Sequence, residues 1–260
     1  MSTTAEVLAA AQLSLEAAGR RDRAGWLSLF AHDGRVEDPV GSTPHVGRAQ
    51  IGRFYDTFIG PREITFESRA DFVEGATVVR DLTLNVRMSA VVALQIPAVL
   101  VYQLDDGEGG LKIKSLQAYW ELAPMMAQFG RKGPAALPAG LSLSRGLLAN
   151  QGVQGALGFA RGFRRPGRAA RAVVADLIAA LTAGDELSTR RILGPGAKLG
   201  TDPAVLGERL RGAHASKILA AGRSITVSLT AGRSEPRGLL IIDFADDAGT
   251  PRISGLRFFG

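Results

Sequence analysis

Few side chains in this sequence could carry out chemistry. The chain has no cysteine, which excludes thiolate catalysis and disulfides, and its three histidines are too widely spaced for a metal-binding motif. The remaining candidates are the carboxyl group of Asp38, the hydroxyl of Tyr55 and the indole N–H of Trp120. A carboxylate can move a proton, and a phenol or an indole can donate a hydrogen bond to an oxygen that gains negative charge. We therefore expect acid–base chemistry that uses no metal and no cofactor.

Asp38 admits two interpretations. It precedes Pro39, and an aspartate in that position commonly starts a turn by accepting hydrogen bonds from backbone N–H groups. The same carboxylate would serve as a base if it were held inside an apolar pocket. Glu37 is expected to point away from Asp38, because adjacent residues of an extended chain face opposite sides. The residues of this loop leave both interpretations open.

The elements that must position these groups follow from the spacing of apolar residues. Helical spacing is found over residues 7–18, 22–30 and 48–58. The pattern then changes to that of strands over residues 64–72, 78–88, 95–104 and 111–120. Between the second and third helices, residues 31–45 are predicted to form a loop, with His32 and His45 on its surface. Three helices followed by an antiparallel sheet predict an α+β domain.

The same order recurs in the second half of the chain. Residues 168–183 have a strong helical pattern that ends at Gly184, as the first helix ends at Gly19. Asp202 and Pro203 parallel Asp38 and Pro39, but an aspartate before a proline is also the usual start of a helix. We predict a first domain over residues 1–122, a linker with short helices over 123–167, and a second, shortened domain over 168–260.

The net charge of +6 is unevenly distributed. Residues 122–175 hold eight bases and no acid, whereas the preceding residues are net acidic, so no nucleic-acid-binding face is expected. The basic segment 123–171 is rich in glycine and carries an apolar stripe. It is a linker that covers sheet edges, a surface helix in weak contact with anionic membrane, or a phosphate-binding segment. The chain has neither a long apolar run nor a signal-peptide pattern, which predicts a cytoplasmic protein.

The stretches Gly34–Ser42 and Gly47–Tyr55 resemble the bacterial ketosteroid isomerases and the SnoaL-like members of the nuclear-transport-factor-2-like superfamily. The resemblance extends over about residues 5–122. It implies a cone-shaped domain in which Asp38 is the general base that moves a proton between two carbons of a 3-keto steroid. It also implies that Tyr55 belongs to the hydrogen-bond network that stabilises the oxyanion.

The sequence departs from that family at two positions. The family's tyrosine in the first helix falls on Ser14, and its protonated aspartate falls near Val99 or Leu100. Neither can replace its counterpart. The base is therefore retained while the usual oxyanion donors are lost.

The aromatic residues predict an apolar pocket in the first domain. Its expected lining is Trp26, Phe30, Phe54, Phe58, Phe66, Leu100, Tyr102 and Trp120. The ligand would be a small apolar molecule such as a steroid-like or polyketide-like cyclic ketone. The resemblance implies double-bond isomerisation by Asp38 and Tyr55, and the alternative is a non-catalytic ligand-binding or scaffold module. The predicted fold is a tandem of cone-shaped α+β domains that form an internal pseudo-dimer or, alternatively, a homodimer.

Overall fold

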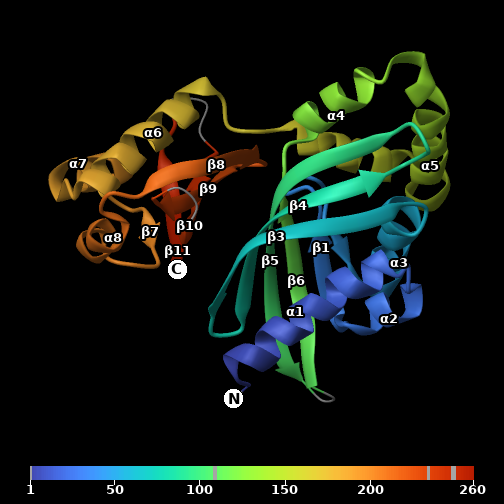
Figure 1. The fold of residues 1–260 in the computed structure, drawn as a ribbon, viewed down its shortest axis with the longest axis horizontal. Coiled ribbons are helices and arrows are strands. Elements are labelled where there is room, and N and C mark those ends of the chain that lie inside the picture. The colour runs from blue at the N-terminus through green and yellow to red at the C-terminus, as the bar shows by residue number, and fades with distance from the viewer. Residues whose placement is uncertain (1, 108–109, 233–234, 247–249) are drawn as a thin grey trace. The chain divides into compact units, whose positions relative to one another are not determined.

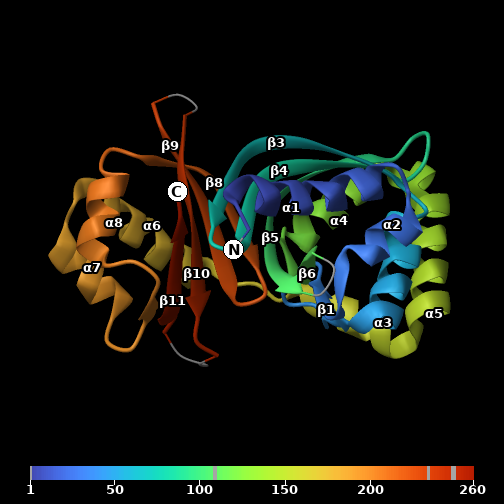
Figure 2. The same ribbon diagram turned by 90° about the horizontal axis from the view of Figure 1, so that it is seen from below.

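The computed structural model describes residues 2–107, 110–232, 235–246 and 250–260 (Figure 1; Figure 2). The chain divides into two compact units, Met1–Phe163 and Arg164–Gly260. Each unit contains one mixed sheet with helices packed against it, which confirms the predicted α+β class. No helix in the described part of the chain is both long and apolar enough to span a bilayer.

Three helical segments lie at the start of the first unit. Helix α1 (Thr4–Gly19) begins with a capping box, in which the side chains of Thr3 and Glu6 bind each other's backbone N–H groups. Helix α2 (Arg23–Ser28) is capped by Asp22. Helix α3 (Gly47–Phe54) continues into the π-helical turn η1 (Tyr55–Ile59). These helices bury their apolar faces against the sheet.

The first sheet has the strand order β2-β1-β6-β5-β4-β3. Its strands are β1 (Phe30–Glu37), β2 (His45–Val46), β3 (Glu63–Glu74), β4 (Thr77–Arg87), β5 (Ala93–Gly107) and β6 (Gly110–Tyr119). Strands β3 to β6 form a long antiparallel meander, and Figure 1 shows their curvature. Trp26, Leu82 and Tyr102 are fully buried in the core between this sheet and the helices.

Strand β1 differs from the sequence prediction, which placed a loop over residues 31–45. The segment pairs in parallel with β6, with Val36 opposite Leu116 and Glu37 opposite Gln117. The register shifts between Phe30 and Arg35, a stretch that includes Gly34. The pairing partner lies some eighty residues away in the sequence. Local patterns therefore did not reveal the strand, but it fixes where Asp38 must lie.

Helices α4 (Leu122–Gly130) and α5 (Leu137–Ala160), with the short 3-10 segments Gly133–Ala136 and Arg161–Phe163, also belong to the first unit. The boundary between the units thus falls after residue 163, inside the segment that the sequence analysis treats as a linker. Helix α5 packs beside α3 and η1 (Figure 1; Figure 2). It is kinked at Gly152, whose φ is 65°.

Gly158, in α5, and Gly162, in the 3-10 segment Arg161–Phe163, let this part of the chain approach the loop that follows β1. A Cβ atom at Gly158 would lie 2.8 Å from Thr43 Oγ1, and one at Gly162 would lie 2.6 Å from Pro39 Cγ. The backbone N–H of Thr43 donates to the carbonyl of Gly158 at 3.1 Å. These glycines, which cost an isolated helix stability, are therefore required where α5 packs against the loop that carries Asp38.

The second unit repeats the order of helices followed by a sheet. Its helices are α6 (Arg168–Ala183), α7 (Glu186–Leu193) and α8 (Pro203–Leu210), and its strands are β7 (Lys198–Leu199), β8 (His214–Ala221), β9 (Ser224–Ala231), β10 (Glu235–Phe244) and β11 (Ile253–Phe259). The sheet order is β7-β11-β10-β9-β8, and the first strand, β7, pairs in parallel with the last, β11, as β1 pairs with β6 in the first unit. Two sheet-bearing units in succession fit the predicted tandem arrangement.

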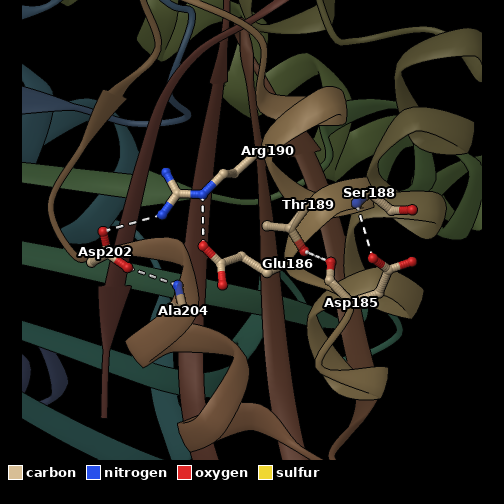
Figure 3. A network of polar contacts seen from close by, with 7 residues as sticks. All are labelled: Asp185, Glu186, Ser188, Thr189, Arg190, Asp202 and Ala204. Carbon is tan, nitrogen blue, oxygen red and sulfur yellow. Dashed lines mark hydrogen bonds and ion pairs between the residues drawn. The ribbon is translucent and has the colours of Figure 1, made fainter.

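The acidic residues at the helix starts of the second unit serve as caps (Figure 3). Asp185 accepts a hydrogen bond from the backbone N–H of Ser188 at 3.0 Å, and Asp202 accepts one from Ala204 at 2.8 Å. Arg190 lies 3.7 Å from Asp202, which links the two capped helices. Asp202 is therefore a capping residue, and it has no role comparable to that expected of Asp38.

Candidate active site

The first unit contains an apolar cavity of about 220 Å³. Its walls are aliphatic and aromatic side chains from β3, β4, β5, η1, α4 and α5, including Phe58, Leu84 and Phe129. Four polar or partly polar side chains interrupt this lining, namely those of Asp38, Arg62, Trp120 and Ser144. The cavity thus has a few polar groups in an otherwise apolar lining, which is typical of small-molecule binding sites.

Asp38 reaches this cavity because of the parallel pairing of β1 and β6. Asp38 follows directly after β1 and Trp120 directly after β6, so the two side chains meet at the same edge of the sheet. Trp120 Nε1 donates to Asp38 Oδ1 at 2.5 Å. Burial raises the pKa of Asp38 to about 6, and the hydrogen bond from Trp120 acts in the opposite direction. The cost of burying the charge is therefore the larger effect.

Glu37, rather than Asp38, is the acid that accepts a backbone hydrogen bond in this turn. Glu37 accepts the backbone N–H of Gly41 at 2.9 Å and the side-chain amide of Gln117 at 3.2 Å. Glu37 thus points away from Asp38, as alternation along the strand predicts. Since Glu37 binds the loop amide, the carboxyl group of Asp38 is left to face the cavity.

Arg62 is a buried cation in the cavity wall that the sequence analysis missed. It is only 8% exposed, its guanidinium donates to the carbonyl oxygen of Thr57, and burial lowers its pKa to about 10. No carboxylate lies within ion-pair distance of it among the described residues. A group with this pKa remains charged at neutral pH. The only sequence signal was a lone base between the apolar residues of η1 and β3.

The structure brings some of the predicted pocket residues to the cavity and leaves others in the core. Phe54, Phe58 and Trp120 line the cavity with Asp38. The remaining predicted lining residues, Trp26, Phe30, Phe66, Leu100 and Tyr102, are not among those that line it. Trp26, for example, packs against the ring of Phe30 with centroids 4.6 Å apart. The aromatic content of the first unit therefore serves packing as much as ligand contact.

Tyr55 is not brought to Asp38. It is 2% exposed, packs against Trp26 with ring centroids 5.4 Å apart, and does not line the cavity. Its hydroxyl has no hydrogen-bond partner among the described residues. Burial raises the pKa of Tyr55, and the charges of Asp22 and Asp56 raise it further. The hydroxyl thus lies on the side of the helices that bears these acids, away from the cavity.

The positions of the two missing family donors are filled by core residues. Leu100 is 5% exposed and belongs to the hydrophobic core. Ser14 lies near the hydroxyl of Tyr102, although that hydroxyl makes no hydrogen bond within the described structure. Burial raises the pKa of Tyr102 to about 12, so it stays neutral at any physiological pH. Neither position provides a donor in the cavity.

Helices α4 and α5 supply cavity residues that sequence reasoning did not assign. These residues are Met125, Met126, Phe129, Leu143 and Phe159. Phe159 stacks against Phe58 with ring centroids 5.1 Å apart. The available signal was the apolar stripe in the glycine-rich segment, which the sequence analysis interpreted as a cover for sheet edges or as a membrane contact. No three His, Asp or Glu side chains gather as a metal site in the described residues.

Comparison with known proteins places the similarity in the first half of the chain. The model of the SnoaL-like domain family matches residues 11–109. The Δ5-3-ketosteroid isomerase from Mycobacterium sp. is 31% identical over 45% of this chain and 95% of that chain, with a TM-score of 0.42. RV0760c from Mycobacterium tuberculosis is 25% identical over 47% of this chain and 96% of its own, with a TM-score of 0.43. An LEH-like epoxide hydrolase from M. tuberculosis is 20% identical over 53% and 98%, with a TM-score of 0.44.

Proposed function

Because this chain belongs, through residues 11–109, to the SnoaL-like and ketosteroid isomerase-like family of the nuclear-transport-factor-2-like superfamily, we propose that its first unit transfers a proton on a cyclic ketone. The observation that carries the proposal is the carboxyl group of Asp38, which lines an apolar cavity and whose pKa is raised to about 6. Such a group is ionised at neutral pH and is a stronger base than an ordinary carboxylate.

The reaction would shift a carbon–carbon double bond into conjugation with the ketone. Asp38 would remove a proton from the carbon between the carbonyl group and the double bond, and the electron pair would spread through the dienolate to its oxygen. The same carboxyl group would then return the proton to the far carbon of the double bond. The indole N–H of Trp120 holds Asp38 in place through both steps. No cofactor takes part in this scheme.

The dienolate oxygen needs a donor, and we assign this role to Arg62. Its guanidinium is buried in the cavity wall and has no carboxylate partner among the described residues, so it is available to a ligand. A fixed donor at a developing oxyanion is commonly worth about 10²–10³ in rate. Arg62 would therefore replace Tyr55 and the two donors that the family has at the positions of Ser14 and Leu100.

The experiment is an ultraviolet assay for the conjugated ketone. The substrates are a Δ5-3-ketosteroid and the smaller 3-cyclohexenone, which tests the chemistry independently of ligand size. We expect Asp38→Asn to lower the rate by about 10²–10⁴, as loss of a general base does, and Arg62→Met to lower it by about 10²–10³. Asp33→Asn, an exposed acid paired with Lys114, is the control and should keep full activity.

The same assay separates isomerisation from the alternative of a non-catalytic binding module. Equal rates for the wild type and Asp38→Asn would remove Asp38 from the mechanism. Binding of a phenolic steroid without turnover of either ketone would support the binding module.

We also propose that the outer face of α5 contacts an anionic membrane surface. Leu137, Leu141 and Leu148 are 64%, 57% and 52% exposed, and Arg145 falls on the same helical face. After the kink, Val153 and Leu157 are 67% and 63% exposed. No acid occurs within residues 122–175, which makes this surface complementary to anionic lipid.

Vesicle sedimentation tests this contact. We expect the protein to bind vesicles of phosphatidylserine and phosphatidylcholine but not vesicles of phosphatidylcholine alone, with release by salt. Leu141→Glu should abolish binding, whereas Leu187→Glu, on an exposed leucine of α7, should not. Equal loss with both variants, or binding that is insensitive to lipid charge, would exclude α5 as the docking element.

A further inference from the structure

A second cavity of about 210 Å³ adjoins the apolar one. Asp38 and Phe159 line both cavities, so the two meet at the side chain proposed as the base. The second cavity lies between the loop after β1, helix α3 and helix α5, and we call it the polar chamber. Ser42, Arg53 and Gln151 are among the residues of its wall.

The polar chamber contains donors that the protein itself leaves unused. Ser42 is 6% exposed, and its hydroxyl has no hydrogen-bond partner within the described structure. The Nε2 atom of Gln151 is likewise buried and unpartnered. Gln50 accepts the backbone N–H of Val46 through its Oε1 atom at 3.1 Å, which leaves its NH₂ group free to donate. Buried donors without partners cost stability, so a site that keeps several of them is prepared for an acceptor.

One residue of the chamber wall, Arg53, carries a positive charge that can bind an oxyanion. Arg53 is exposed at the chamber wall, and no acid pairs with it among the described residues. His45 also lines the chamber and packs against Phe54, and burial followed by the charge of Arg53 lowers its pKa to about 4. The imidazole is therefore neutral at pH 7. Asp38 is the one acid that lines the chamber among the described residues, and it also lines the apolar cavity.

Each of the two cavities is small for a ligand site. Ligand sites in proteins usually measure about 300–1,000 Å³. Neither the apolar cavity, about 220 Å³, nor the polar chamber, about 210 Å³, reaches that range alone. Together they do.

We propose that a single ligand spans both cavities, with an apolar ring system in the apolar cavity and a carboxylate group in the polar chamber, held by Arg53, Ser42 and Gln151. The identity of the substrate rests on the proposed function. If the first unit acts on a cyclic ketone, that substrate would be a cyclic keto acid, with its ketone oxygen at Arg62 and its carboxylate at Arg53. The binding part of the proposal stands independently of turnover.

Two fluorescent probes with the same ring skeleton test the proposal. One is 1-anilinonaphthalene-8-sulfonate, which carries an anionic oxyacid group, and the other is the neutral N-phenyl-1-naphthylamine. Both are titrated into the full chain at neutral pH. We expect the wild type to bind the sulfonate more tightly. Arg53→Met should weaken sulfonate binding by roughly tenfold or more, as expected for loss of a charged hydrogen bond, and change neutral-probe binding less than about twofold.

Ser42→Ala and Gln151→Leu should also weaken sulfonate binding selectively. Each removes an unsatisfied buried donor, so each should raise the unfolding midpoint of the ligand-free protein. A residue with a purely structural role would lower it. Arg48→Met, on an exposed arginine of α3 that lines neither cavity, is the control and should leave both probes unaffected.

Three results would overturn the proposal. The first is equal binding of the two probes by the wild type. The second is a loss of affinity for both probes in Arg53→Met, which would indicate damage to the fold. The third is loss of the anion preference in Arg62→Met but not in Arg53→Met, which would place the anion in the apolar cavity. Since neither probe is turned over, a negative isomerase assay leaves this test unchanged.

Discussion

Asp38 should make the folded protein less stable at neutral pH, and Asp38→Asn should relieve this cost. Burial raises the pKa of Asp38 from its ordinary value of 3.8 to about 6. The folded state therefore holds the proton more tightly than the unfolded state. The cost of burying the charge is absent below pH 3.8, grows between pH 3.8 and 6, and is complete above that window. One pKa unit corresponds to about 1.4 kcal/mol, so the full cost is about 3 kcal/mol.

Asparagine keeps the shape of the side chain and an oxygen that accepts from Trp120, but it carries no charge. Any difference in stability between asparagine and the protonated form of Asp38 adds an offset that does not vary with pH. Apart from that offset, the gain in the free energy of unfolding should be about 3 kcal/mol at pH 8 and about 1 kcal/mol at pH 4.5. The diagnostic quantity is this change of the gain with pH.

Urea denaturation followed by tryptophan fluorescence measures the effect. Both tryptophans of the chain, Trp26 and Trp120, lie in the first unit, so the signal reports on the unit that contains Asp38. Asp33→Asn is a control of opposite sign, because the hydrogen bond from Lys114 lowers the pKa of Asp33. That variant should gain no stability at pH 8. A gain from Asp38→Asn that is the same at both pH values, or one that is smaller at pH 8 than at pH 4.5, would refute the burial argument.

Two other measurements, the pH dependence of the rate and urea denaturation, test the site and the packing of α5. The rate kcat/KM should rise with pH through an apparent pKa of about 6, because the base must be ionised. Trp120→Phe removes the hydrogen bond that lowers the pKa of Asp38. Because such a bond to a charge is worth about 1.5–3 kcal/mol, the pH–rate profile should move to higher pH by roughly one unit or more. An unchanged profile would contradict the role of Trp120. Gly158→Ala should cost about 1–3 kcal/mol by forcing a methyl group against Thr43. Gly146→Ala, with open space around it, should instead stabilise the first unit by up to about 1 kcal/mol in the same urea assay.

The sequence could predict the parts of this site that depend on local patterns. Asp38 and Trp120 were identified as a carboxylate and a donor, and Phe54 and Phe58 as cavity residues, because a loop motif and helical spacing are visible in a short window. The helices and the four long strands of the first unit were predicted for the same reason. Strand β1 was not, because its partner β6 is remote in sequence.

The orientation of Tyr55 and the packing of α5 at the cavity could not be predicted from local sequence patterns. Tyr55 belongs to the recognised motif, but the direction of its hydroxyl depends on how η1 packs against Trp26. Glycines within α5 resemble those of a flexible linker, and only the close approach of Gly158 to Thr43 shows why glycine is needed at that position. The sequence alone does not distinguish a glycine that permits close packing from one that permits bending.

Arg62 does not lower the pKa of Asp38, although both residues line the apolar cavity. A cation close to a carboxylate lowers the pKa of that carboxylate. The pKa of Asp38 is instead raised, and burial and the hydrogen bond from Trp120 account for it without a contribution from Arg62. The two groups line the same cavity but do not pair with each other. Asp38 therefore keeps its raised pKa with Arg62 in the wall of the same cavity. In the proposed mechanism, Asp38 acts as the base while Arg62 binds the oxygen that becomes charged.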